Sequence, residues 1–225
     1  MSKHMIVLGG GESGVGAALL GHQLGYKVFV SDKGTIGTSF QKELDDHQIQ
    51  WEQGQHTAAQ ILQADLVIKS PGIPSDIPIV EAIRSAEIPL LSEIEFASLH
   101  TDAELIGITG TNGKTTTAML THHLLASAGK SVALAGNIGE SFAKAITTNS
   151  PDYWVLELSS FQLEDILSFH PRYAVMTSLT PDHLDRYNNS FDRYVDAKFC
   201  MLKNQTEEDY FIYDDSDDEI KLALE

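Results

Sequence analysis

Two glycine-rich turns, each lying between an apolar run and a helical pattern, are the segments of this sequence best suited to hold phosphate. The first, LGGGESGVG, reads as Gly9-x-Gly11-x-x-Gly14, and Asp32 ends the next apolar run. This spacing is typical of dinucleotide-binding turns, in which an acid on the second strand holds a ribose hydroxyl. Because the motif alone is weak, an NAD enzyme and a protein that binds another phosphate both stay open.

The second turn, GITGTNGKTTT, gives the stronger signal. Backbone N–H groups and the helix N-terminus would hold a polyphosphate there, and Lys114 would neutralise its outer phosphates. The Thr115 hydroxyl is placed to ligate Mg²⁺. A strict Walker A motif has a glycine five places before Gly113, where this chain has Ile108, so the loop is a variant, and a chance Gly-Lys-Thr turn is the alternative. The expected ATP-binding residues are Gly110, Thr111, Asn112, Gly113, Lys114, Thr115 and Thr116.

Polar groups also follow two later apolar runs, and the carboxyl ends of parallel strands meet at one edge of a sheet. Glu157 is a hard oxygen ligand suited to Mg²⁺, although an acid that merely stabilises a helix N-terminus is an equal alternative. His183, after Asp182, could reach a metal or a phosphate, although a lone histidine is more often structural. Ser159, Ser160 and Gln162 could simply cap the following helix.

Short apolar runs alternate with helical patterns along the whole chain, which predicts an α/β fold with parallel sheets. The expected strands are HMIVLGG, KVFVSD, ADLVIKSPGIP, IPLLSE, ELIGITG, SVALAGNIG, DYWVLELSS, YAVMTSLTPDH and one beginning in EEDYFIY. The expected helices are residues 13–25, FQKELDDH, TAAQILQ, PIVEAIRSAE, EIEFASLH, KTTTAMLTHHLLASAG and FDRYVDAKFCMLKN, and further helical patterns lie between the strands SVALAGNIG, DYWVLELSS and YAVMTSLTPDH. The acidic cluster 214–219 is expected to be a solvated turn.

This pattern predicts a Rossmann-like domain over residues 1–93 and a P-loop ATPase-type α/β domain over 94–225. The second series begins strands that it does not finish, so we expect the second domain to be truncated. The net charge of −17 argues against binding to nucleic acid or to an anionic membrane. One cysteine in 225 residues excludes an internal disulfide framework and a thiolate metal cluster. We expect a cytoplasmic monomer.

Four segments in order, GTNGKTT, GNIG, ELSSFQLE and DHLDRY, resemble the Mur ligase family of peptidoglycan synthesis, which serves cell-wall growth, cell shape and cell division. ELSSFQLE with DHLDRY is similar to the members that add D-glutamate. The resemblance covers essentially the whole chain. It implies that the first domain binds a uridine nucleotide and the central domain binds ATP, while a third, amino-acid-binding domain is absent from this sequence.

The resemblance also implies roles for individual residues. Asn137 matches the family asparagine that touches the substrate. Lys198, a surface lysine by periodicity alone, matches a lysine that family members carry as a carbamate, a ligand for a second Mg²⁺ beside His183. After Asp32 this chain has Lys33 and Gly34 where the family often has Thr and Arg. The residues expected to bind the UDP substrate are Gly11, Glu12, Ser13, Gly14, Asp32, Lys33, Ser70, Pro71, Gly72 and Asn137; the expected catalytic residues are Lys114, Asn137, His183 and Lys198; the expected metal ligands are Thr115, Glu157, His183 and Lys198.

The implied reaction is an ATP-dependent ligation through an acyl phosphate, with UDP-N-acetylmuramoyl-L-alanine, ATP and D-glutamate as partners and two Mg²⁺ ions as cofactors. We expect the 225-residue chain alone to be inactive in ligation. Three alternatives stay open: another Mur ligase or a folylpolyglutamate synthase-like ligase, a dehydrogenase, and a P-loop switch or ATPase without ligation. Which nucleotide binds the first domain would discriminate among them.

Overall fold

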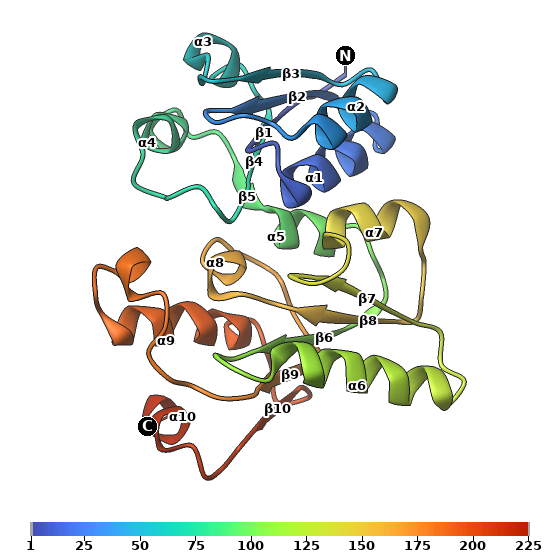
Figure 1. The fold of residues 1–225 in the computed structure, drawn as a ribbon, viewed down its shortest axis with the longest axis vertical. Coiled ribbons are helices and arrows are strands. Elements are labelled where there is room, and N and C mark those ends of the chain that lie inside the picture. The colour runs from blue at the N-terminus through green and yellow to red at the C-terminus, as the bar shows by residue number, and fades with distance from the viewer. Residues whose placement is uncertain (1, 225) are drawn as a thin grey trace. The chain divides into compact units, whose positions relative to one another are not determined.

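The computed structural model describes residues 2–224, which fold as two compact units (Figure 1). The first unit contains the residues up to His100 together with Glu140–Thr148, and the second contains Thr101–Gly139 and the residues from Asn149 onward. Met1 and Glu225, which the predicted domain ranges include, lie outside the described residues. Each unit is built on one five-stranded parallel sheet, which confirms the predicted α/β fold class.

The first unit has the sheet order β3-β2-β1-β4-β5, so β1 and its glycine turn lie at the centre. Because helices cover both faces, β1 and β4 are almost fully apolar and buried. The elements are β1 (His4–Leu8), α1 (Glu12–Gln23), β2 (Lys27–Asp32), α2 (Thr38–Asp46), β3 (Gln50–Gln53), α3 (Ala58–Ile61), β4 (Leu66–Lys69), α4 (Pro78–Ser85), β5 (Leu90–Ser92) and α5 (Glu93–Ser98).

The first unit also contains α7 (Phe142–Thr148), a helix that lies in the sequence between two segments of the second unit. α7 packs against α1 and α5 (Figure 1). Two carboxylates accept hydrogen bonds from its start: Glu93 Oε1 from the Ala143 N–H at 2.6 Å and Glu12 Oε1 from the Ser141 N–H at 3.3 Å. Carboxylates stabilise a helix N-terminus, so these two bonds anchor α7 in the first unit.

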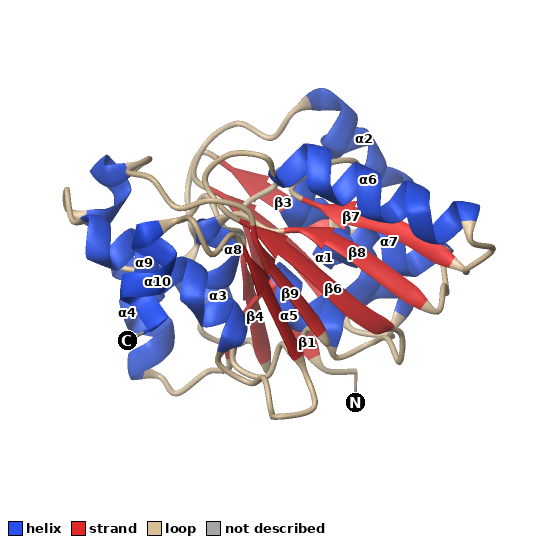
Figure 2. Ribbon diagram, turned by 90° about the horizontal axis from the view of Figure 1, so that it is seen from below, coloured by secondary structure: helices blue, strands red, loops and turns tan. Residues whose placement is uncertain are grey.

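The second unit has the order β10-β9-β6-β8-β7, which again puts the strand before a glycine-rich loop, β6, at the centre (Figure 2). α6 packs against β6, β7 and β8. The elements are β6 (Glu104–Thr109), α6 (Lys114–Ser127), β7 (Val132–Gly136), β8 (Tyr153–Glu157), α8 (Ser160–Leu163), β9 (Tyr173–Met176), the 3₁₀ helix η1 (Leu184–Tyr187), α9 (Phe191–Phe199), the 3₁₀ helix η2 (Cys200–Leu202), β10 (Tyr210–Tyr213) and α10 (Asp218–Leu224).

Local signals explain where α8 begins. Ser159 Oγ accepts a hydrogen bond from the Gln162 N–H, and Gln162 Oε1 accepts one from the Ser159 N–H at 2.9 Å, which together form a capping box. The capping role expected for these residues is therefore confirmed. Three elements were not predicted: β3, the 3₁₀ helix η1, and α10, whose first turn contains Asp218 and Glu219 of the acidic cluster expected to be a turn.

No helix within residues 2–224 combines the length and the apolar character that crossing a bilayer would need.

Candidate nucleotide and phosphate sites

The loop between β6 and α6 is held in a conformation that needs glycine at both ends. Gly110 has φ = 142° and Gly113 has φ = 86°, values that side-chain-bearing residues rarely adopt. A Cβ atom at Gly110 would also overlap the Thr177 hydroxyl. The loop therefore passes tightly against the residues that follow β9 and brings the N-terminus of α6 to the carboxyl edge of the sheet, as its sequence predicts.

The backbone of this loop is only partly free to bind a ligand. The Thr111 N–H donates to Ser178 O at 2.8 Å, and the Asn112 N–H donates to Ser178 Oγ at 3.0 Å. Thr111 Oγ1 donates to Thr180 O at 2.9 Å. By helix geometry the first N–H groups of α6 have no intrahelical acceptor, so an anion would meet the amides at the start of α6 rather than those of Thr111 and Asn112.

Lys114 folds back over the loop. Its Nζ donates to the carbonyl oxygens of Gly110 at 3.0 Å and Thr111 at 2.8 Å. These contacts place a positive charge directly beside the amides at the N-terminus of α6. A lysine there can neutralise a phosphate that those amides bind.

Glu157 connects the loop to the neighbouring strand end. Its side chain is buried, with 1% of the residue exposed. Oε2 accepts a hydrogen bond from Thr115 Oγ1 at 2.8 Å, and Oε1 accepts one from Asn137 Nδ2 at 2.9 Å. The structure thus brings three sequence-predicted site residues, Thr115, Asn137 and Glu157, into one cluster in the second unit.

Lys198 is buried, with 2% of the residue exposed, so the alternative of a solvated surface lysine is wrong. Its Nζ donates to the Gly110 carbonyl oxygen at 2.8 Å and lies 4.7 Å from the centre of the Tyr194 ring. Burial lowers the pKa of Lys198 to about 7; the charge of Lys114 acts in the same direction, and that of Asp182 opposes it. The sequence pattern gave no sign of this burial.

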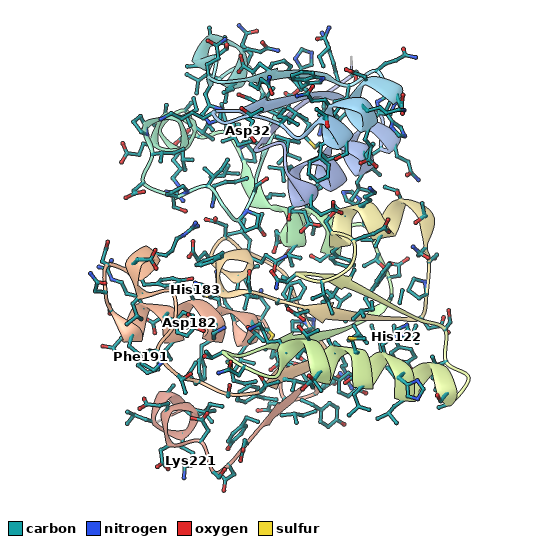
Figure 3. All side chains as sticks on the ribbon, in the orientation of Figure 1. Asp32, His122, Asp182, His183, Phe191 and Lys221 are labelled. Carbon is teal, nitrogen blue, oxygen red and sulfur yellow. The ribbon has the colours of Figure 1, made fainter. Side chains whose placement is uncertain are left out.

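His183 lies at the surface in a left-handed conformation with φ = 49°. Its Nε2 is 3.6 Å from Asp182 Oδ2; both residues are labelled in Figure 3. The centre of its ring is 5.3 Å from that of Phe161 in α8. Among the described residues it makes no hydrogen bond to Glu157 or Lys198. Within residues 2–224, no hydrogen bond joins His183 to the cluster of Thr115, Asn137 and Glu157.

The oxygen donors of the second unit fit a Mg²⁺ ion shared with phosphates. Within residues 2–224 no three or more His, Cys, Asp or Glu side chains form a metal-binding group. Thr115 and Glu157 nevertheless place a hydroxyl and a carboxylate 2.8 Å apart. Mg²⁺ commonly binds to one or two such protein ligands and takes its other ligands from phosphates and water, so this pair is sufficient on the protein side.

In the first unit the side chain that holds the glycine turn is a carboxylate, Asp32, whereas in the second unit it is the cation of Lys114. Asp32 Oδ2 accepts from the Gly10 N–H at 2.6 Å, and Oδ1 accepts from the Gly34 N–H at 2.7 Å. A Cβ atom at Gly14 would overlap the Gly9 carbonyl oxygen, so α1 can approach the turn only with glycine there. Both oxygens of Asp32 hold loops together, which weakens the reading of Asp32 as a ribose ligand.

The other residues expected in the first unit lie around this turn. Gly11 is exposed and precedes α1, and Glu12 and Ser13 form the first turn of the helix, half-buried. The Ser70 N–H donates to Leu8 O at 3.0 Å, so the Ser70-Pro71-Gly72 turn follows β4 beside the glycine turn. Asn137 belongs to the second unit, where it binds Glu157.

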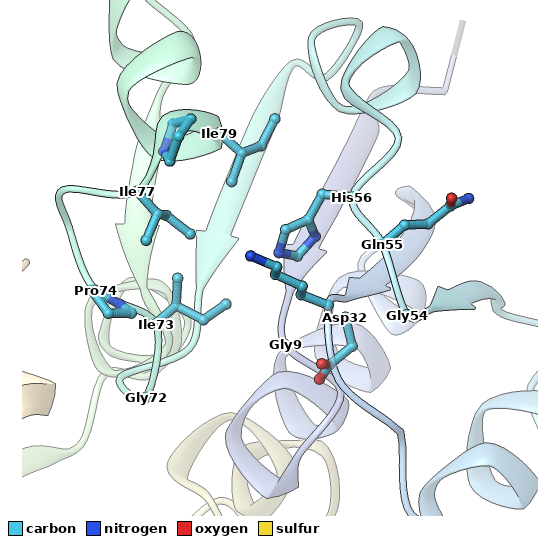
Figure 4. Close-up of a pocket in the computed structure, with 12 residues that line it drawn as sticks. Gly9, Asp32, Gly54, Gln55, His56, Gly72, Ile73, Pro74, Ile77 and Ile79 are labelled. Carbon is cyan, nitrogen blue, oxygen red and sulfur yellow. The ribbon is translucent and has the colours of Figure 1, made fainter.

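A pocket of about 670 Å³ opens beside the glycine turn (Figure 4). Of the expected residues, Asp32, Lys33 and Gly72 line it. In Figure 4 the His56 ring points into the pocket from one side, and Ile73, Ile77 and Ile79 face it from the other. Gly9 of the predicted glycine turn also lines the pocket. Sequence reasoning missed two other parts of the lining: the residues that follow the unpredicted strand β3, which are Gly54, Gln55 and His56, and the residues between β4 and the first turn of α4, which are Ile73, Pro74, Ile77, Pro78 and Ile79.

Two parallel α/β units, each with a glycine-rich turn at the carboxyl end of its central strand, form an architecture that is typical of α/β proteins that bind nucleotides. The family model described as Mur ligase middle domain matches residues 108–225, and the model described as MurD N-terminal domain matches residues 5–78. The chain belongs to the Mur ligase family, as its motifs indicate.

Individual relatives agree. The chain is 50% identical over 223 residues to the UDP-N-acetylmuramoylalanine--D-glutamate ligase of Bacteroides fragilis, covering 99% of this chain and 50% of the relative. It is 48% identical to the ligase of the same name from Christiangramia forsetii, covering 100% of this chain and 51% of the relative. The chain spans about half the length of these curated relatives.

A solved structure shows the same fold. The UDP-N-acetylmuramate:L-alanyl-gamma-D-glutamyl-meso-diaminopimelate ligase from Neisseria meningitides superposes with a TM-score of 0.70 at 21% identity, covering 100% of this chain and 75% of that one. At this identity the match supports the fold alone.

Proposed function

We propose that residues 1–225 carry the nucleotide-binding part of an ATP-dependent ligase that adds D-glutamate to UDP-N-acetylmuramoyl-L-alanine. The observation that carries the proposal is the 50% identity, over 99% of this chain, to ligases of that name. The loop geometry of the second unit supports it independently, because it offers a helix N-terminus, a lysine and a hydroxyl–carboxylate pair at one strand end.

The first unit is proposed to bind the uridine part of the substrate. Its pocket of about 670 Å³ has the size of a small-molecule site and lies against a glycine turn. The start of α1 at Glu12 and Ser13, together with Gly11 and Gly14, offers backbone N–H groups to a diphosphate. Asp32, Lys33 and the Ser70-Pro71-Gly72 turn would surround it.

The second unit is proposed to bind ATP. The amides of Gly113 through Thr116 would hold the polyphosphate, and Lys114 would exchange its carbonyl contacts for phosphate oxygens. Thr115 and Glu157 would hold Mg²⁺, which when bound neutralises charge on the transferred phosphoryl group. Asn137 fixes the second oxygen of Glu157 and so keeps the carboxylate oriented.

The chemistry follows from the poor reactivity of a carboxylate. In the proposed reaction an oxygen of the L-alanine carboxylate attacks the γ-phosphorus of ATP, which releases ADP and leaves an acyl phosphate. The amine of D-glutamate then attacks the acyl carbon, phosphate departs with the electron pair of the C–O bond, and the amine loses a proton. The task of the protein is to hold anions together, for which Lys114 and a positioned Glu157 are suited.

Lys198 is proposed to carry a carbamate. The lone pair of neutral Nζ would attack CO₂, forming an N–C bond and releasing one proton, so a buried cation would become an anion able to bind a second Mg²⁺ with His183. The burial of Lys198 beside Lys114 supports this, because both favour the neutral amine that the reaction needs.

Carbon-13 NMR with labelled bicarbonate and Mg²⁺ tests the carbamate. We expect one carbamate resonance in the parent chain, none in Lys198→Arg, and an unchanged one in Lys203→Arg, a matched change at an exposed lysine. A resonance that persists in Lys198→Arg would assign the modification to another amine.

Calorimetric titration tests the function. We expect UDP-N-acetylmuramoyl-L-alanine and Mg-ATP each to bind the 225-residue chain and NADH not to bind it. Because the chain spans half the length of its curated relatives, we expect no amide product from the three substrates with this chain alone. Binding of NADH without any response to the UDP substrate would favour the dehydrogenase alternative.

A further inference from the structure

A partly buried polar cluster, centred on the buried Ser31, lies behind one wall of the pocket of the first unit. Ser31 on β2 is 0% exposed and its Oγ is 2.7 Å from Glu52 Oε1 and 2.8 Å from His56 Nδ1. β2 and β3 pair with Ser31 opposite Glu52, so the two side chains share one face of the sheet. The strand register therefore fixes a chain of contacts from Glu52 through Ser31 to His56.

The hydrogen-bond partners of Glu52, Ser31 and His56 determine where each proton lies. Glu52 also accepts hydrogen bonds from the Thr57 N–H at 2.8 Å, from Thr57 Oγ1 at 2.5 Å and from Gln55 Nε2 at 3.2 Å. Desolvation acts to raise the pKa of Glu52, but the bonds from Thr57, Ser31 and Gln55 together hold it below its usual value. Glu52 is thus an ionised, acceptor-only group.

The ionised Glu52 takes the single hydroxyl proton of Ser31, because a carboxylate at 2.7 Å is a stronger acceptor than a neutral imidazole nitrogen and lies closer than the Gln55 carbonyl oxygen at 3.4 Å. Ser31 Oγ can then only accept from His56, so the proton of the neutral imidazole is on Nδ1. Nε2 is left with its lone pair. Burial lowers the pKa of His56, Lys33 acts in the same direction, and Asp32 and Glu52 oppose it.

The His56 ring points into the pocket, as Figure 4 shows, and His56 is one of the lining residues. The facing wall is apolar and consists of Ile73, Pro74, Ile77, Pro78 and Ile79. Such a site favours a flat ring that stacks on hydrocarbon and offers one N–H donor at its edge.

We propose that His56 is the specificity-determining residue of this pocket, accepting at Nε2 a hydrogen bond from the imide N–H of a uracil-type base. This inference rests on the proposed function, which supplies a uridine nucleotide as the ligand. A cytosine ring has a lone pair at the same position and would face the lone pair of Nε2, so the pocket rejects it. Ser31 and Glu52 are positioning residues, because they act through the tautomer of His56.

A cycle of ligand and protein changes tests the proposal. Calorimetry on the 225-residue chain compares UDP with CDP, with N3-methyl-UDP and with 2′-deoxy-UDP. We expect CDP and N3-methyl-UDP to bind the parent chain about tenfold more weakly than UDP, the upper end of the effect of one net hydrogen bond. In His56→Ala we expect the affinity for UDP to fall by about the same tenfold factor and the preference for UDP over CDP to disappear.

Two further variants sharpen the cycle. His47→Ala removes an exposed histidine of the same unit and is expected to keep the parent's preference. Ser31→Ala is expected to lose part of the preference, because the Nδ1–H tautomer is no longer enforced. Nitrogen-15 NMR of the ligand-free parent reads that tautomer directly, and circular dichroism checks that every variant is folded.

The possible outcomes separate the inference from the function on which it rests. If the parent chain binds no UDP, both fail. If UDP binds but N3-methyl-UDP and CDP bind equally well, or if the neutral His56 carries its proton on Nε2, only the role of His56 is overturned. If 2′-deoxy-UDP binds the parent chain more weakly than UDP does, and this difference disappears in His56→Ala, then a ribose hydroxyl donates to His56. That result would also overturn the proposal.

Discussion

The two glycine-rich turns occupy the same place in their sheets but differ in charge. Each follows the central strand of a five-stranded parallel sheet and leads into a helix. In the first unit the nearest fixed charge is the carboxylate of Asp32, bonded to the Gly10 N–H. In the second unit two lysines, Lys114 and Lys198, both donate to the Gly110 carbonyl oxygen.

Under the proposed function, topology places both phosphate sites and side-chain charge distinguishes them. Among the described residues, the first turn offers a diphosphate backbone N–H groups without a neighbouring lysine bonded to the loop, so binding there would also depend on a base in the neighbouring pocket. A turn flanked by lysines and a hydroxyl–carboxylate pair suits a polyphosphate with its metal. The expected outcomes below test this contrast, from the largest effect to the smallest.

The largest expected effect is steric and confined to the first turn. Gly14→Ala places a Cβ atom on the Gly9 carbonyl oxygen, whereas nothing lies within 4 Å of a Cβ at Gly11. We expect Gly14→Ala to lower the free energy of unfolding of the first unit by about 3 kcal/mol, and Gly11→Ala to change it by less than about 1 kcal/mol.

Denaturation followed by tryptophan fluorescence measures this, since Trp51 lies in the first unit and Trp154 in the second. Single-tryptophan variants keep the two signals apart. An unchanged Trp51 midpoint in Gly14→Ala would show that the helix does not need its close approach to the turn.

The next effect is electrostatic and confined to the second turn. Lys114→Ala removes the cation beside the helix N-terminus, and we expect Mg-ATP affinity to fall roughly a hundredfold, about 2.7 kcal/mol. UDP affinity should not change, and Lys203→Ala serves as a control. Calorimetry measures the Mg-ATP and UDP affinities of the parent chain, Lys114→Ala and Lys203→Ala. If Lys114→Ala binds ATP as tightly as the parent chain, the assignment of this loop to ATP is wrong.

A smaller effect concerns pH. The pKa of Lys198 is about 7 in the folded chain and near its usual value when unfolded, so between these values only the unfolded state is protonated at this site. The unfolded state then binds more protons, and the free energy of unfolding rises with pH by up to about 1.4 kcal/mol per unit.

Lys198→Met should remove this rise. Urea denaturation at pH 7, 8 and 9 in bicarbonate-free buffer measures the slope, and Lys203→Met provides the matched control. Identical slopes in the parent chain and in Lys198→Met would mean that Lys198 keeps its proton when buried.

The sequence predicted the two sheets and the second loop well, because buried parallel strands are apolar throughout and Gly-Lys-Thr at a helix start has few other uses. β3 was missed because three of its four residues, QWEQ, are polar: within the described residues it is an edge strand, paired with β2 and held by contacts such as Ser31 with Glu52. α10 was missed because Ile220 alone is buried on a short acidic helix.

Other features depend on tertiary contacts that no local pattern carries. The docking of α7 in the first unit requires Glu12 and Glu93, which are distant in sequence. The burial of Lys198 arises from the loop at Gly110, 88 residues away. The orientation of His56 in the pocket wall depends on the register of β2 and β3, which places Ser31 opposite Glu52. These contacts join residues that are far apart in the sequence, so they could not be predicted before the fold was known.

The most direct test of the central claim, that the two turns bind two different nucleotides at separate sites, is a residue-resolved NMR titration of the 225-residue chain with UDP and Mg-ATP, alone and together. The account predicts that UDP shifts the amides near Gly11 and His56, that Mg-ATP shifts those near Gly113 and Lys114, and that each set of shifts is unchanged by the other ligand. Competition of the two nucleotides for one set of amides would contradict it.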